Sequence, residues 1–155
     1  YFVGFSLGGL IGEDLLKQGL VEFDRVALFA PALAVRTISH AVKLVSFLSG
    51  GVSLPSSAPE SYRANRGTTL AAYRALFDVL EDLNASTGRT LSQNVPTRVF
   101  VDSHDELVSP EGLEDYIQDR GLNQWSIRRA DTPLSGHGGR HHLIVDSYSL
   151  GAPTY

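Results

Sequence analysis

Short apolar runs alternate with amphipathic segments along this chain, and this alternation constrains the fold more than any other feature. Apolar runs typical of buried strands occupy residues 1–5, 26–29, 98–101 and 124–128. Helical periodicity occupies residues 7–18, 68–84 and 110–120, with Gly19 and Gly121 as stop signals. Strands that alternate with helices predict an α/β fold built on a parallel sheet with flanking helices. Functional residues are then expected at the carboxyl ends of the strands.

The residues between the second and third strand runs are less regular. Residues 33–51 form a mixed helical segment, and SLPSSAPES at residues 53–61 is typical of a loop rich in Pro and Ser. Residues 68–84 have the clearest amphipathic pattern in the chain. Their apolar positions are Leu70, Tyr73, Leu76, Phe77, Leu80 and Leu83.

Composition excludes several classes of function. The 155 residues fit one ordinary domain, and a hydrophobic content of 43% is enough for a buried core. A net charge of −4 without clustered Lys and Arg argues against a nucleic-acid partner. The chain has no cysteine, which excludes disulfides and metal sites with Cys ligands. No apolar run approaches the roughly 18 residues that a transmembrane helix needs.

The first strand run ends at Gly4-Phe5-Ser6-Leu7-Gly8, a G-x-S-x-G motif between a strand and a helix. Such a motif holds a serine on a sharp, strained turn, so that its hydroxyl projects from the sheet as a nucleophile. Small residues are expected on both sides of the serine, because the turn crowds the neighbouring strand and helix. The backbone N–H of Leu7, at the helix N-terminus, can bind an oxyanion. The alternative is a Gly-rich turn with Ser6 as an ordinary helix N-cap.

A serine nucleophile needs a base and an acid, and the acid is sought after the third strand run. The stretch VFVDSHDELVSP offers Asp102, Asp105 and Glu106. We favour Asp105, because a loop carboxylate just past the strand can turn toward a histidine on the next loop. Asp102 is expected to cap the turn, and Glu106 is a weaker candidate. In the alternative interpretation both aspartates are simple turn residues.

The base is expected in the tail that follows the last strand run. His142 ranks first because it begins the apolar segment HLIVD, followed by His141 and then His137, and at most one of them is the base. His40, in the middle segment, is interpreted as an inert surface histidine, and His104 adjoins the acid. The tail pattern HxxxHH has no matched carboxylates nearby in the sequence, so no metal site is expected there.

These three stretches together resemble the α/β-hydrolase superfamily. The resemblance rests on VGFSLGG (residues 3–9), VFVDSHDELVSP (residues 99–110) and HHLIVD (residues 141–146), in the order of that family. It implies a serine hydrolase that cleaves carboxylic esters of small molecules or lipids through Ser6, His142 and Asp105, an acyl-enzyme and no cofactor. VGFSLGG looks like the motif of lipases, esterases and lysophospholipases. The alternatives are a thioesterase, an acyltransferase or a non-catalytic binding domain of the same fold.

The resemblance also predicts how the chain is divided. Residues 1–32 would form the strand, turn and helix around the nucleophile and the next strand, and residues 95–155 the part with the acid and histidine. Residues 33–94 would form a helical lid, although helix 68–84 fits equally well as a helix packed on the sheet. The chain begins with Tyr and has no Met, so we expect a fragment without the N-terminal half and its oxyanion donor. Loss of one such donor typically costs ~10²–10³ in rate.

Overall fold

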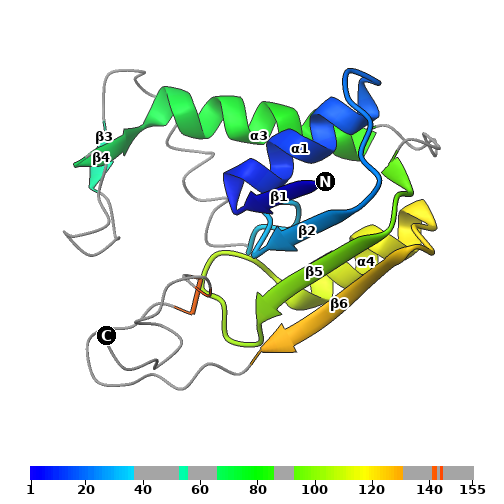
Figure 1. Cartoon of the computed structure of the whole chain (residues 1–155). Helices are drawn as coiled ribbons and strands as arrows, with labels where there is room; N and C mark the ends of the chain where they lie inside the picture. Colours follow the sequence, from blue (N-terminus) through cyan, green and yellow to red (C-terminus); the bar gives the residue numbers. More distant parts are fainter. Residues whose placement is uncertain (37–52, 56–65, 86–92, 131–140, 143, 145–155) are drawn as a thin grey trace, which may run out of the picture.

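The computed structural model describes residues 1–36, 53–55, 66–85, 93–130, 141–142 and 144. Its main sheet has four strands in the order β1-β2-β5-β6, and each neighbouring pair is parallel. The strands are β1 (Phe2–Phe5), β2 (Val26–Phe29), β5 (Thr97–Asp102) and β6 (Trp125–Ala130) (Figure 1). The predicted α/β class with a parallel sheet and flanking helices is confirmed.

The helices of the described residues are α1 (Leu7–Lys17), α3 (Leu70–Ala85) and α4 (Pro110–Arg120). α4 begins with Pro110 after the N-cap Ser109, whose side chain accepts a hydrogen bond from the Gly112 N–H at 3.0 Å. It ends at Gly121, which has a left-handed φ of 56° that favours glycine. In the part of the chain that the structure describes, no helix has both the length and the hydropathy to cross a membrane.

A small antiparallel pair corrects one expectation. The segment predicted as part of a loop contains β3 (Ser53–Pro55), which pairs with β4 (Gly67–Thr69). This pairing joins residues more than ten positions apart, and neither three-residue strand has an alternating pattern that a sequence could reveal. Helix α3 consequently begins at Leu70 rather than Thr68, and Thr69 Oγ1 accepts a hydrogen bond from the Ala72 N–H at 3.2 Å. The mixed helical segment predicted at 33–51 lies largely outside the described residues.

The helices cover one face of the main sheet. Alternate strand residues are buried in a cluster shared with all three helices. Its members include Leu10 of α1, Leu83 of α3, Leu113 of α4, and Val26, Leu28, Val99 and Val101 of the strands. Lys17 of α1 donates to the Asp82 carboxylate of α3 at 2.6 Å, and Arg120 of α4 donates to the Leu83 carbonyl of α3 at 2.8 Å. Val3 and Arg98, of the opposite parity in β1 and β5, are exposed.

Helix α3 thus shares the core of the sheet through its buried side chains. Phe77, Leu80 and Leu83 belong to the same cluster as the strand residues, and α3 lies beside α1 (Figure 1). This packing favours the interpretation of residues 68–84 as a helix packed on the sheet. The lid at residues 33–94 and the divisions at 1–32 and 95–155 stay predictions.

The charged residue Glu13 lies inside this core, on the buried side of α1. Glu13 is 2% exposed, and neither carboxyl oxygen has a hydrogen-bond partner among the described residues. Burial raises the pKa of Glu13 to about 8, and the Arg120 guanidinium offsets only part of that effect. The native state therefore favours the neutral carboxyl at pH values where the unfolded chain is ionised.

We expect the free energy of unfolding to fall as the pH rises from about 4.5 to about 8, because the unfolded state loses the Glu13 proton first. Glu13→Gln should remove this dependence and stabilise the protein at pH 8.5 by on the order of a few kcal/mol, with little effect at pH 5. Urea unfolding at pH 5 and pH 8.5 measures the free energy of unfolding of the variant and of the unaltered chain. Asp14→Asn, the same charge change beside it on α1, is the control and should not reproduce the effect.

Candidate active site

Ser6 occupies the sharp turn between β1 and α1. Its φ of 50° and ψ of −116° are strained for a residue with a side chain, and the side chain does not cap the helix. The backbone is fixed on both sides, since Ser6 N–H donates to the Phe29 carbonyl at 2.9 Å and the Ser6 carbonyl accepts from the Ala32 N–H at 3.0 Å. The ordinary N-cap alternative is therefore disfavoured, because the Ser6 hydroxyl makes no capping hydrogen bond to the described residues of α1.

Only one of the two glycines that flank Ser6 in the motif is required by crowding, and the neighbouring Gly9 is required as well. A Cβ on Gly4 would lie 2.8 Å from the Gly9 Cα, so Gly4 is required as the sequence predicts. A Cβ on Gly8 would meet no atom within 4 Å among the described residues, which corrects the expectation for the second glycine of the motif. The crowding falls instead on Gly9, where a Cβ would lie 2.8 Å from the Pro31 Cβ.

Alanine at these two adjacent glycines should therefore have opposite consequences. Gly9→Ala should lower the free energy of unfolding by about 1–3 kcal/mol, because the Pro31 backbone turn cannot move away cheaply. Gly8→Ala should be neutral or stabilise the protein by up to about 1 kcal/mol, because alanine is the better helix former. Denaturant unfolding of both variants measures the difference. Equal destabilisation by the two substitutions would contradict the packing argument.

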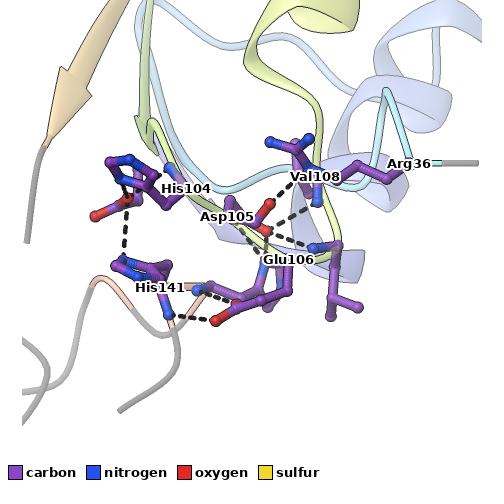
Figure 2. A network of polar contacts seen from close by, with 9 residues as sticks. Arg36, His104, Asp105, Glu106, Val108 and His141 are labelled. Atoms are coloured by element: carbon purple, nitrogen blue, oxygen red, sulfur yellow. Dashed lines mark hydrogen bonds and ion pairs between the residues drawn. The ribbon is translucent and has the colours of Figure 1, made fainter. Parts of the chain in front are cut away.

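The loop after β5 holds Asp105 with its carboxylate fully buried. Asp105 Oδ1 accepts hydrogen bonds from the backbone N–H groups of Leu107 and Val108, each at 2.8 Å. The Asp105 carbonyl accepts a further bond from Arg36 Nε at 2.6 Å, which ties this loop to the segment after β2 (Figure 2). The two backbone donors fix the orientation of the carboxylate.

His142 connects that carboxylate to Ser6. Its Nδ1 lies 2.9 Å from Asp105 Oδ2, and its Nε2 lies 2.9 Å from Ser6 Oγ. The side chain is 10% exposed, and its ring centroid lies 5.3 Å from that of Phe5. An imidazole protonated at Nδ1 donates to Asp105 and can accept the hydroxyl proton of Ser6 at Nε2. The structure thus brings together the serine, acid and histidine that the sequence ranks first.

The competing candidates among the described residues lie close by, but their side chains are directed at other groups. Asp102 Oδ1 accepts from the backbone N–H of His104 at 2.8 Å, as a turn-capping residue does. His141 Nδ1 lies 3.2 Å from Asp102 Oδ1, and the His104 side chain is 70% exposed. His40 and His137 lie outside the described residues.

Glu106 lies beside the histidine segment, although sequence reasoning considered it only as a weaker candidate for the acid. Its Oε1 accepts from the His141 N–H and its Oε2 from the His142 N–H, each at 3.1 Å (Figure 2). The carboxylate thus holds the backbone of the histidine segment against the loop after β5. No local pattern predicts this contact, because the two partners are 35 and 36 residues away.

A cavity of about 390 Å³ lies between α3, α4 and the segment after β2, and none of Ser6, Asp105 and His142 lines it. Its walls include apolar Leu33 and Phe77 and charged Glu81 and Arg120. The cavity is therefore separate from the chemistry described above and gives no indication of an acyl-chain pocket.

Comparisons with known proteins identify the fold. The structure is similar to a monoacylglycerol lipase of Paleococcus ferrophilus, with a TM-score of 0.65, 18% identity and coverage of 84% of this chain and 58% of the lipase. It is similar to a soluble variant of the monoglyceride lipase of Saccharomyces cerevisiae, with a TM-score of 0.69, 13% identity and coverage of 96% and 59%. It is also similar to a metagenome-derived lipolytic enzyme, with a TM-score of 0.66, 18% identity and coverage of 84% of this chain and 55% of that enzyme. No protein-family model and no curated protein matches the sequence.

The chain therefore has the α/β-hydrolase fold, as the resemblance of its motifs predicts. It spans 55–59% of the length of these three structures, so it corresponds to part of that fold.

Proposed function

We propose that the chain carries the nucleophile, base and acid of a serine hydrolase that cleaves carboxylic esters. The observation that supports this most is the continuous line of contacts from Ser6 Oγ through His142 to Asp105, with both contacts at 2.9 Å. The strained backbone at Ser6 adds support, because such strain is concentrated at functional sites. The names of the similar structures, which are lipases, favour a lipid or small-molecule ester as the substrate.

In the proposed acylation, Ser6 Oγ attacks the acyl carbon of the ester while His142 Nε2 takes the hydroxyl proton. The carbonyl oxygen becomes an oxyanion, which the Leu7 N–H binds. Leu7 is the first residue of α1, where backbone N–H groups have no acceptor within the helix and the helix dipole favours negative charge. The bond to the alkoxy group then breaks, and His142 transfers its proton to the leaving alcohol.

Water completes the cycle in the proposed deacylation. His142 removes a proton from the water as it attacks the acyl carbon, and the Ser6 oxygen leaves with that proton. The net reaction converts one ester and one water into a carboxylic acid and an alcohol. Throughout, Asp105 holds the Nδ1–H of His142 and stabilises the imidazolium. The reaction needs no metal or organic cofactor.

Covalent labelling with a fluorophosphonate tests the nucleophile directly. The chain, and the longest gene product that contains it, should be labelled, and mass spectrometry of the labelled peptide should find the adduct on Ser6. Ser6→Ala should lose the label, whereas the control Ser126→Ala, at an exposed position of β6, should keep it. An adduct on another serine, or the absence of any adduct, would reject Ser6 as the nucleophile.

Substrate comparison distinguishes the alternatives on the same fold. Turnover of p-nitrophenyl esters above that of matched acyl thioesters would support an esterase, and the reverse would indicate a thioesterase. Transfer of the acyl group to an added alcohol would indicate an acyltransferase. A protein that forms the adduct but turns over none of these substrates would fit a binding domain.

Glu106→Gln should lower kcat by about tenfold with KM nearly unchanged, because a glutamine keeps at most one of the two bonds to the histidine backbone. Its amide nitrogen would face the other backbone N–H. Steady-state kinetics and unfolding measured side by side separate this positioning effect from a loss of stability. The control is Glu114→Gln, which alters an exposed ion pair with Arg129 and should leave both constants unchanged.

A further inference from the structure

A second cluster of polar side chains lies next to the triad residues but shares none of them. Asp102 is the last residue of β5, His104 follows two residues later, and His141 comes from the tail segment. Asp102 Oδ1 lies 3.6 Å from His104 Nδ1 and 3.2 Å from His141 Nδ1. One ligand atom of each side chain lies within 4.8 Å of the ligand atoms of the other two.

We propose that Asp102, His104 and His141 bind a single divalent transition-metal ion, with Zn²⁺ as the first candidate. Two imidazole nitrogens and one carboxylate oxygen form a donor set that suits Zn²⁺, and also Cu²⁺ and Ni²⁺. Ligands about 2.0–2.1 Å from a tetrahedral ion lie roughly 3.3 Å apart, close to both contacts of the Asp102 carboxylate. Three protein ligands would leave the fourth position to water.

Burial and charge in the cluster favour a cation. The Asp102 carboxylate is 0% exposed, and among the residues that the structure describes the buried Nδ1 of His141 has no hydrogen-bond partner. A positive ion between these groups would bind the charge of Asp102 and the lone pair of His141 at once. His104 lies at the surface with a 70% exposed side chain, which gives an ion access from solvent. Its ring centroid is 5.3 Å from that of His141 (Figure 2), and the Nδ1 atoms of both rings lie within 3.6 Å of Asp102 Oδ1.

The bound ion would connect the end of β5 to the segment that carries His142. Two ligands belong to the strand end and its loop, whereas the third is the residue directly before His142. The ion would therefore hold this segment in place together with the Glu106 carboxylate. It takes no part in the proposed ester chemistry, and the metal site does not depend on that proposal.

Metal binding is tested on the chain without an affinity tag. Titration with Co²⁺ alone should give the visible absorption of a tetrahedral site at one ion per chain, and Zn²⁺ should displace it. His104→Ala, at an exposed position that folding does not need, should weaken Zn²⁺ binding by at least about tenfold, since even loss of an outer-shell partner costs 10- to 100-fold. His141→Ala should do the same.

The control is His137→Ala, which removes another histidine of the tail, one that the proposed site does not use. It should leave Zn²⁺ affinity unchanged. Loss of binding in His137→Ala but not in His104→Ala would overturn the proposal and assign the ion to the tail histidines. Absence of Zn²⁺ and Co²⁺ binding to the unaltered chain would overturn it as well.

Discussion

His142→Ala should reduce ester hydrolysis by roughly 10⁴- to 10⁶-fold, because Ser6 would then have no base to take its proton. The imidazole is the contact between the hydroxyl and the Asp105 carboxylate, at 2.9 Å on each side. Substrate affinity should change little, so the loss should fall on kcat. The measurement is steady-state hydrolysis of a p-nitrophenyl ester by the longest gene product that contains the chain, together with its rate of fluorophosphonate labelling.

The matched control for this prediction is His141→Ala, one residue away in the same segment. Measured in chelator-treated buffer, it should lower kcat by at most about tenfold, because its side chain is directed at Asp102 rather than at Ser6. The comparison addresses the choice that the sequence left open. A larger loss in His141→Ala than in His142→Ala would exchange the two roles, and full activity in both would leave the base to His137.

The elements around the nucleophile could be predicted because their information is local. A strand run, a turn with glycines and an amphipathic run follow one another within residues 1–18, and the structure has β1, Ser6 and α1 there. Strand bounds differ by one or two residues, because ladder pairing rather than composition sets them. Thr97, which the apolar run does not include, pairs with Trp125 and is buried.

Long-range contacts explain what sequence reasoning missed. The β3–β4 pair and the bond from Glu106 to the histidine segment both join residues far apart in the chain, and no local pattern encodes them. Glu13 was missed for a related reason. Its burial depends on how α1 and α4 share the core, where Arg120 and Tyr116 of α4 interact electrostatically with Glu13.

The ranking of the site residues depended on their positions relative to the strand and to the apolar segment, whereas the orientation of their side chains required the fold. His141 and His142 are adjacent in sequence, yet one side chain is directed at Asp102 and the other at Asp105. Asp102, at the end of β5, and Asp105, in the loop after it, are likewise only three residues apart. The sequence could rank the members of each pair but could not determine the direction of a side chain. Whether the favoured three act in catalysis stays a prediction.

Asp105→Asn should lower kcat by about 10⁴-fold while the protein stays folded. Asp105 Oδ1 accepts two backbone N–H groups, from Leu107 and Val108, so the amide oxygen of an asparagine should stay at that position. The amide nitrogen would then occupy the place of Oδ2, 2.9 Å from His142 Nδ1. It would donate to Nδ1 and leave the imidazole proton on Nε2, and this tautomer cannot accept the proton of Ser6.

The matched substitution Asp102→Asn makes the same chemical change three residues earlier, at the end of β5, at an equally buried carboxylate. It should lower kcat by less than about tenfold, because Asp102 contacts His104 and His141 rather than His142. Steady-state kinetics, with denaturant unfolding to check that both variants fold, measure the ratio between the two. Equal losses would mean that the loop needs two buried charges for its conformation, and the specific role of Asp105 would then be rejected.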